Sequence, residues 1–298
     1  MGMRVRTWAT VLVLSLLPAF LAARTRTDDA GRRVEVVENP QRIVSLAPSL
    51  TETLFALGLG ERVVGVTDYC DYPAEARSKT RVGGIINPSV EAIVSLAPDL
   101  VLITREGNRR ETMEALERLG VPVFAVNTNE LADVFRTIRH LGELAGVPER
   151  GRRLAADLER QSAAIAEAIR PYPARRVLFL VWLQPVVSVG RNSFIEGLLQ
   201  RSGAESIAEA SAQPWPHLSI EEILRSEPEF ILIPRSSSFA PTRAQLLRLP
   251  GWRELKAVRA GRIVYLPATV ERPGPRLIEV QDVIARAIHP EAFKPSDK

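Results

Sequence analysis

Two stretches of this sequence, 130 residues apart, carry the same pattern, and this repeat constrains the fold more than any other feature. Residues 89–103 read SVEAIVSLAPDLVLI and residues 219–233 read SIEEILRSEPEFILI, with identical residues at six of fifteen positions. Each copy has a serine suited to cap a helix, acidic residues in the first turn, a proline that ends the helix and then an apolar run. Such a run is typical of a strand buried on both faces of a parallel sheet. The repeat therefore predicts two similar lobes.

The order of apolar segments elsewhere agrees with this interpretation. Residues 42–46 and 176–180 are predicted strands that are each followed by a helix, and residues 121–126 and 262–266 are again similar short strands. Strands that alternate with helices predict an α/β fold with mainly parallel sheets and right-handed crossovers. Chance similarity of a single strand and helix is the alternative explanation of the repeat.

The most helical part of the sequence lies between the two halves. Residues 148–170 contain no proline after the first position and keep apolar residues on one helical face. A helix of this length would span roughly 34 Å, about the width of a small domain. We therefore predict an N-terminal lobe at residues 24–145, a rigid connecting helix at residues 146–172 and a C-terminal lobe at residues 173–298.

The first 23 residues have the pattern of an export signal. Arg4 and Arg6 precede an uncharged apolar stretch that ends in small residues. The stretch contains Pro18 and is short for a membrane span, and no cysteine follows it for lipid attachment. We expect a protein secreted to the periplasm through this signal peptide; retention of the signal as an uncleaved anchor is the alternative.

Composition excludes several other classes. Hydrophobic residues make up 46% and charged residues 25%, the balance of a globular protein. The single cysteine, Cys70, excludes an internal disulfide and a Cys-based zinc site, and three widely spaced histidines disfavour a His-rich metal site. No Lys/Arg run with interleaved aromatic residues indicates nucleic-acid binding. We expect no cofactor, no protein-bound metal and no nucleic-acid partner.

The motifs of common enzymes are missing from the sequence. It contains no G-x-S-x-G, no H-E-x-x-H, no P-loop and no G-x-G-x-x-G. We therefore predict that the protein is not an enzyme and has no catalytic residues. A secreted hydrolase stays open as an alternative, because the members of a Ser/His/Asp triad meet only in space. A periplasmic sensor is a further alternative.

Aromatic residues that follow predicted strands are candidates for ligand contacts, because ligands of open α/β sheets bind outside the carboxyl ends of the strands. Tyr69 lies in a loop of turn-forming residues. Trp215 is held between Pro214 and Pro216 just before a predicted helix cap, which restricts its backbone. The alternative is that each ring packs within its own lobe.

Three polar residues near the ends of predicted strands have two interpretations each. Arg105 and Arg272 could offer forked donors to an anionic ligand, although surface solvation explains most arginines. His217 could bind a metal centre carried by a ligand, although a lone histidine at a loop end is more often a hydrogen-bonding residue. Trp182 and Cys70 are interpreted as packing residues.

Three segments, RIVSLAPSLTETLFALGLGERVVGVTDYCDYP, PSVEAIVSLAPDLVL and QPWPHLSIEEILRSEP, resemble the periplasmic substrate-binding proteins of ABC importers for cobalamin, haem and ferric siderophores. The cobalamin-binding members are the most similar, and the likeness covers roughly residues 32–290. It implies two Rossmann-like lobes joined by one long helix, with a ligand cleft between them. It also implies a monomer that delivers a small molecule to an importer permease and meets the membrane only through that permease or an uncleaved signal anchor.

The resemblance also implies roles for individual residues. Tyr69 and Trp215 would contact the ligand from opposite lobes. Glu91 and Glu221, one in each copy of the repeat, would project toward arginines of the permease. Both glutamates fall in the first turn of capped helices, where a negative charge is favourable, and this helix effect alone explains either glutamate singly.

Departures from the cobalamin-binding pattern bear on the ligand. This chain has Ile85 and Thr104 where those proteins have tryptophans, while Arg272 matches a basic position. Ile85 is therefore a further candidate for a ligand contact. We expect a cobalamin-like corrinoid; haem or a ferric siderophore is the alternative, for which His217 or Tyr69 would be an axial donor.

Overall fold

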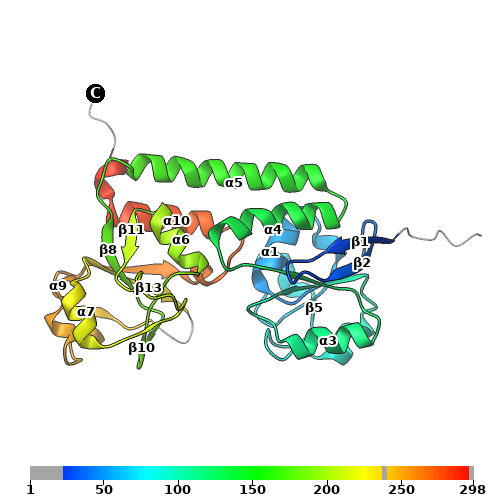
Figure 1. Ribbon diagram of the computed structural model, residues 1–298, viewed down its shortest axis with the longest axis horizontal. Coiled ribbons are helices and arrows are strands. Elements are labelled where there is room, and N and C mark those ends of the chain that lie inside the picture. Colours follow the sequence, from blue (N-terminus) through cyan, green and yellow to red (C-terminus); the bar gives the residue numbers. More distant parts are fainter. Residues whose placement is uncertain (1–22, 237–239, 295–298) are drawn as a thin grey trace, which may run out of the picture.

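Two α/β lobes joined by a long helix make up the protein, as the repeat predicts (Figure 1). The structure is a computed structural model and describes residues 23–236 and 240–294. The predicted export signal, residues 1–23, lies outside the described residues except for Ala23, which begins a strand. Within the two described ranges no helix combines the length and the apolar character needed to cross a membrane.

The N-terminal lobe is built on a five-stranded parallel sheet with the order β5-β4-β3-β6-β7. The strands are β3 (Ile43–Ser45), β4 (Val63–Val66), β5 (Thr80–Arg81), β6 (Leu100–Thr104) and β7 (Val123–Val126). One face is covered by α1 (Pro48–Ala56) and α4 (Leu131–Leu144), and the other by α2 (Val90–Ser95) and α3 (Arg110–Arg118). Along β6, Leu100 and Leu102 pack in the core formed with α1 and α4, and Val101 and Ile103 pack in the core formed with α2 and α3. The strand is therefore buried on both faces, as predicted.

A hairpin that the sequence did not predict precedes this sheet. It consists of β1 (Ala23–Thr27) and β2 (Arg33–Val37), which pair antiparallel. Val34 and Val36 alternate with exposed residues and pack in the same core as α1 and α4. The Asp28 carboxylate accepts the backbone N–H of Ala125 in β7, which ties the hairpin to the edge of the sheet.

The C-terminal lobe contains a four-stranded parallel sheet with the order β11-β8-β13-β14. The strands are β8 (Arg175–Phe179), β11 (Ala204–Ser206), β13 (Phe230–Arg235) and β14 (Ile263–Pro267). One face packs on α6 (Phe194–Arg201) and α10 (Leu277–Ile288), and the other on α7 (Ile220–Ser226), α8 (Arg243–Leu246) and α9 (Lys256–Arg259). A small antiparallel sheet is formed by β9 (Trp182–Leu183), β10 (Val186–Val187) and β12 (His217–Leu218).

Within the described ranges, residues 23–236 and 240–294, five short 3₁₀ helices complete the two lobes. They span Gly60–Arg62, Ala74–Ser78, Trp252–Glu254, Ala268–Glu271 and Pro290–Phe293. The helix at Ala268–Glu271 follows β14, and the chain then passes through Arg272–Arg276 into α10. Residues of this passage contact α1 of the N-terminal lobe.

The two copies of the repeat adopt the same backbone path. Ser89 and Ser219 cap α2 and α7, each accepting a backbone N–H three residues on. The chain then turns through Ala97 and Glu227, whose φ angles of 42° and 43° lie in the left-handed region. These two residues are again 130 positions apart. Because non-glycine residues seldom adopt this conformation, its recurrence supports a duplicated unit beyond the identical letters.

A single long helix, α5 (Pro148–Ile169), lies across both lobes (Figure 1). It begins two residues after the start and ends three residues before the end of the predicted connecting segment, residues 146–172. It packs against α4 of the first lobe and α10 of the second. The approach to α4 is very close, because a Cβ added to Gly142 would lie 2.9 Å from the Cα of Gly151. Both helices therefore need glycine at their crossing.

We predict that Gly142→Val lowers the free energy of unfolding by about 1–3 kcal/mol, because the added side chain meets the α5 backbone rather than a movable side chain. Urea denaturation followed by circular dichroism measures this change. Ala164→Val, at an exposed position of α5, is the matched control and should change it by about 0.5 kcal/mol or less. Equal stability of the two variants would contradict the close packing of α4 and α5.

Candidate functional site

In the N-terminal lobe, one asparagine joins the loops at the carboxyl ends of three strands. The Asn108 amide donates hydrogen bonds to Leu46 O (3.0 Å) and Ile85 O (2.8 Å). Its Oδ1 atom accepts the backbone N–H of Thr104 at 2.9 Å. The sequence analysis did not name Asn108, although an asparagine in the loop after a buried strand often hydrogen-bonds nearby backbone groups.

Tyr69 stands on the loop that follows β4. Its side chain points into solvent, with 59% of the residue exposed. A Cβ added to Gly84 would lie 4.0 Å from the Tyr69 ring, so the ring lies beside the loop that carries Ile85. Ile85 itself is half-buried. The Tyr69 ring therefore does not pack within its own lobe. The two residues predicted to contact the ligand, Tyr69 and Ile85, lie on adjacent loops.

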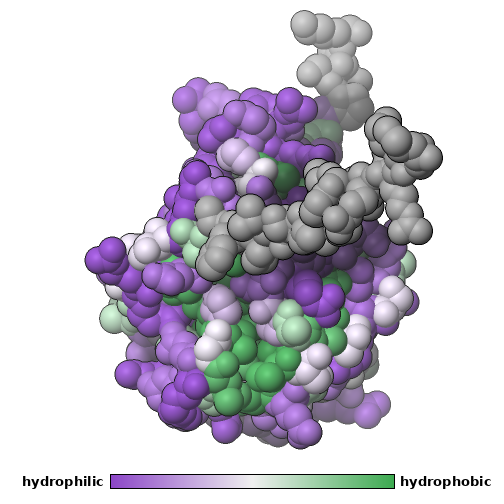
Figure 2. Space-filling view, turned by 90° about the vertical axis from the view of Figure 1, so that its right-hand side faces the viewer, coloured by the Kyte–Doolittle hydropathy of each residue, from purple (hydrophilic) through white to green (hydrophobic). Residues whose placement is uncertain are grey.

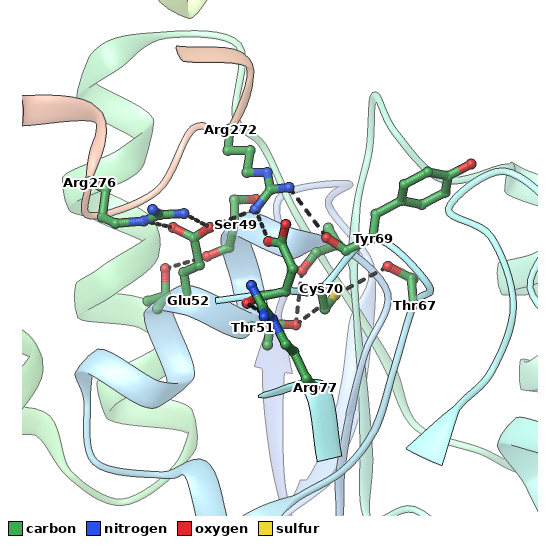
Figure 3. Close-up of polar contacts among 12 residues, drawn as sticks. Ser49, Thr51, Glu52, Thr67, Tyr69, Cys70, Arg77, Arg272 and Arg276 are labelled. Carbon is green, nitrogen blue, oxygen red and sulfur yellow. Dashed lines mark hydrogen bonds and ion pairs between the residues drawn. The ribbon is translucent and has the colours of Figure 1, made fainter. Parts of the chain in front are cut away.

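The loop that carries Tyr69 is anchored by the thiol of Cys70. Thr51 Oγ1 donates to Cys70 Sγ at 3.1 Å, and Thr67 Oγ1 lies 3.2 Å from the same sulfur (Figure 3). Cys70 is buried, as its interpretation as a packing residue predicts. Thr104 is also buried, and its hydroxyl accepts the backbone N–H of Gly107. These side chains hold the loops rather than face outward.

Arg105 is held away from Tyr69. Its Nη1 atom donates to the backbone oxygen of Asp29 at 3.1 Å, in the turn of the β1–β2 hairpin. That hairpin lies beside β7, on the opposite side of β3 and β6 from the Tyr69 loop. The structure therefore does not bring Arg105 together with Tyr69 and Ile85.

The small antiparallel sheet of the C-terminal lobe presents an aromatic surface. Val187 pairs with Trp182 on one side and His217 on the other, so these three side chains share a face. The opposite face, Leu183, Val186 and Leu218, packs in the core. Hydrogen bonds from Ser188 N to Pro216 O and from Gly190 N to Pro214 O continue the pairing, which places Trp215 on the same face as His217.

We call Trp182, Trp215 and His217 the aromatic face. The two tryptophans are 44% and 43% exposed, and His217 is exposed as well. The interpretation of Trp182 as a packing residue was wrong, because the register of β9 with β10 turns it to the solvent side. Its indole Nε1 donates to Gln184 O at 3.0 Å, which holds the ring in place. Trp215 likewise does not pack in the core of its lobe.

A buried carboxylate connects the two lobes. Glu52 of α1 has a side chain that is 3% exposed, and it accepts two hydrogen bonds from Arg276 of the C-terminal lobe, at 2.9 and 2.6 Å. Arg272 Nη1 lies 3.2 Å from the same carboxylate (Figure 3). The Tyr72 ring stacks on Arg276, with 3.7 Å between the guanidinium carbon and the ring centre. We call Glu52, Arg272 and Arg276 the interlobe cluster.

The arginines of the interlobe cluster come from a rigid segment, Arg-Pro-Gly-Pro-Arg at residues 272–276. A Cβ added to Gly274 would lie 3.4 Å from Ser49 Cα, so the segment rests against α1. Arg272 also bonds the Asp71 carboxylate at 2.5 Å and Tyr69 O at 3.4 Å. Arg272, predicted as a ligand contact, thus already has three partners.

Charges within the cluster change its pKa values. The hydrogen bond from Arg272 lowers the pKa of Asp71, and the charge of Arg272 adds to this effect. Burial alone would lower the pKa of Arg272, but the bonds and charges of Asp71 and Glu52 outweigh burial and raise it. Asp71 is therefore ionised throughout the neutral pH range.

A groove of about 830 Å³ lies next to the interlobe cluster. It is lined by residues of α1, α5 and the start of α10, among them Phe55, Gln161 and Arg276. The groove borders the connecting helix rather than the carboxyl ends of the strands, so it differs from the position predicted for a ligand cleft.

Glu91 and Glu221 occupy equivalent places in the two lobes. Each is the second residue of its helix, in α2 and α7, and each is exposed. Among residues 23–236 and 240–294 neither carboxylate forms a hydrogen bond or an ion pair, whereas Glu222 is engaged with its own helix cap. Val94, one turn after Glu91, is also exposed. Figure 2 shows apolar surface in the lower part of this lobe, the part where Figure 1 labels α3. Two accessible acids thus stand at matched positions.

The residues described here form no site for a protein-bound metal. In the part of the chain covered by the structure, no three His, Cys, Asp or Glu side chains gather closely enough to hold an ion. His217 stands apart from the other two histidines: His140 lies 3.8 Å from Asp29, and His289 is buried beside Gly203. A metal at His217 would therefore have to arrive with its own ligands.

We predict that Glu52→Ala lowers the free energy of unfolding by about 3 kcal/mol, because it leaves Arg276 half-buried without its carboxylate. Thermal and urea unfolding measure the loss. Glu75→Ala removes an exposed acid from the same lobe and should change stability by about 0.5 kcal/mol or less. A loss below about 1 kcal/mol for Glu52→Ala would show that the interlobe cluster contributes little to the free energy of unfolding.

Comparison with known proteins gives a consistent set of similarities. A family model described as periplasmic binding protein matches residues 43–270. The vitamin B12-binding protein of Pectobacterium atrosepticum is 33% identical over 199 residues, 65% of this chain and 71% of the relative. An uncharacterized ABC transporter substrate-binding lipoprotein of Bacillus subtilis, YvrC, is 32% identical over 277 residues, 90% of this chain and 86% of the relative. The periplasmic heme-binding protein RhuT from Roseiflexus sp. RS-1 superposes with a TM-score of 0.77 at 29% identity, over 85% of this chain and 99% of that structure.

Proposed function

We propose that this chain, which belongs to the periplasmic binding protein family, captures a cobalamin-like corrinoid between its two lobes and delivers it to an ABC importer. Members of this family bind substrates for transporters and are not enzymes, so the hydrolase considered from the sequence is set aside. The ligand is cargo in this proposal: the chain binds and releases it without changing its covalent structure. Export to the periplasm through the N-terminal signal is part of the same proposal.

The observation that carries this proposal is the aromatic surface offered by each lobe. Trp182 and Trp215 are exposed on one face of the small sheet, and Tyr69 is exposed on the loop after β4. Rigid rings offer broad apolar contact at a small cost in conformational entropy, which suits a large flat macrocycle. In the proposed complex the corrinoid lies between the Tyr69 loop, with Ile85 beside it, and the aromatic face.

Haem is the second candidate ligand, and His217 is the observation that favours it. Its imidazole is exposed on the same face as the two tryptophans. A flat apolar surface with one imidazole is suited to a metal macrocycle that has a free axial position, and Tyr69 offers a second oxygen donor. The similarity to RhuT supports the same candidate. A ferric siderophore remains the third ligand to test.

The ligand is tested by titrating the purified protein with cyanocobalamin, haemin and a ferric siderophore in parallel. We expect saturable one-to-one binding of cyanocobalamin, which is monitored through the quenching of tryptophan fluorescence. Trp182→Ala and Trp215→Ala should each raise its Kd by about tenfold, since truncation of a central aromatic contact costs more than 1 kcal/mol.

Leu119→Ala serves as the matched control, because Leu119 is an exposed apolar residue at the end of α3. It should leave the Kd unchanged. Saturable binding of haemin instead, with a shift of its absorbance that His217→Ala removes, would replace the corrinoid by haem. Binding of none of the three compounds would contradict the proposed function.

Delivery to the importer is assigned to Glu91 and Glu221. Charges at the rim of an interface set docking rate and register, and two acids at matched places suit a two-subunit permease. We predict that Glu91→Ala with Glu221→Ala abolishes ligand uptake in cells while ligand binding by the purified protein is unchanged. Loss of uptake also separates an importer component from a periplasmic sensor.

The control for this pair is Glu111→Ala with Glu279→Ala. Both are exposed acids in the first turns of other helices, one in each lobe. Uptake should survive this change, since the same total charge is removed at positions outside the proposed docking surface. If uptake survives both double replacements equally, Glu91 and Glu221 do not dock the permease.

A further inference from the structure

Arg272 is held by two carboxylates that differ sharply in exposure. Its Nη1 atom lies 3.2 Å from Glu52 Oε1 and 2.5 Å from Asp71 Oδ1. The Glu52 side chain is buried, whereas 53% of the Asp71 side chain is exposed. Glu52 also takes two hydrogen bonds from Arg276. Arg272 is therefore fixed from the buried side and covered by Asp71 from the solvent side.

The two ion pairs differ in how easily they are replaced. A buried carboxylate that loses its partner remains desolvated and unpaired, so Glu52 keeps its arginines. A half-exposed carboxylate is solvated by water and screened by salt, so its pair contributes little. Another anion at the same guanidinium can therefore replace Asp71 at small cost, while Glu52 keeps Arg272 in position.

Asp71 and Arg272 lie at the base of the loop that carries Tyr69. Arg272 Nη2 lies 3.4 Å from Tyr69 O, and Asp71 is two residues after Tyr69. Figure 3 shows the Tyr69 ring directed away from these ion pairs while its backbone meets Arg272. A group bound beside the Tyr69 ring thus has Arg272 within the same loop region.

We propose that Asp71 holds the place of an anionic group of the ligand, which displaces it from Arg272 on binding. The inference rests on the proposed function and deepens it by naming the ligand class: a tetrapyrrole with a carboxylate or phosphate at its edge. The propionates of haem and the phosphodiester of cobalamin both have this chemistry. The guanidinium, already oriented by Glu52, offers its forked donors to the incoming oxygens. Asp71 is a specificity-determining residue in this account, because a ligand without an anionic group leaves its pair with Arg272 intact.

The test compares Asp71→Ala with the unaltered chain on two matched pairs of ligands. Haemin is paired with its dimethyl ester, which lacks free carboxylates, and cyanocobalamin with dicyanocobinamide, which lacks the phosphodiester. In whichever pair binds, Asp71→Ala should lower the Kd of the member with the anionic group by about two- to fivefold, and leave the Kd of the member without this group unchanged. The pair that binds identifies the source of the anion. Arg272→Gln should remove the difference between the two members.

Asp68→Ala is the matched control, because it removes the same charge from an exposed position of the same loop. Equal effects of Asp68→Ala and Asp71→Ala, or equal effects on both members of a pair, overturn the inference and leave the proposed function standing. Failure of both pairs to bind the unaltered chain overturns this inference, and failure of the ferric siderophore to bind as well overturns the proposed function.

A measurement without ligand tests the covered state of Arg272. Phenylglyoxal modifies accessible guanidinium groups, and mass spectrometry of peptides reports the rate at Arg272 itself. The rate should rise in Asp71→Ala and stay unchanged in Asp68→Ala. An unchanged rate in Asp71→Ala shows that Asp71 does not shield the Arg272 guanidinium from the reagent. This result overturns the inference, whichever ligand binds.

Discussion

The carboxylate of Glu52 is the interaction on which the arrangement of the lobes depends. It belongs to the first lobe, is almost completely buried, and takes both its charge partners from the second lobe. A buried charge without partners is costly, so the lobes are stabilised in the orientation that brings Arg272 and Arg276 to Glu52. The Pro-Gly-Pro between the two arginines presents them as a fixed pair, and Tyr72 stacks on one of them. Together with α5, this contact gives the lobes a second point of attachment far along the chain from the first.

The loops at the ends of the strands are held by side chains that bond to other side chains and to the backbone. Asn108 ties three loops together through backbone groups, and the hydroxyls of Thr51 and Thr67 hold the thiol of Cys70. The aromatic residues can face solvent because these groups bond to the backbone and fix the loops. On the second lobe the same result comes from strand register, which turns two tryptophans outward and three aliphatic side chains inward. Each lobe thus combines a rigid support with an exposed ring.

Local interactions explain why so much of the fold was predictable. The repeat contains its own instructions: serine caps, a proline after the helix and apolar strands, all of which act over a few residues. The parallel sheets, the two lobes and the long helix between them follow from such signals. Exposure of Tyr69 and Trp215 was also within reach, since turn formers and flanking prolines act on the adjacent backbone. The hairpin β1–β2 was missed because its short strands gain their stability by packing on the first lobe.

The sequence alone determined the α/β class, the duplication, the connecting helix and the matched positions of Glu91 and Glu221, because each depends on spacing and capping along the chain. Only the tertiary structure decided the surroundings of the site. Trp182 is exposed because of its pairing with β10, Arg105 turns to a carbonyl of the hairpin, and Arg272 meets a carboxylate 220 residues away in sequence. Such contacts depend on which loops the folded sheets bring together, and no local pattern encodes that choice.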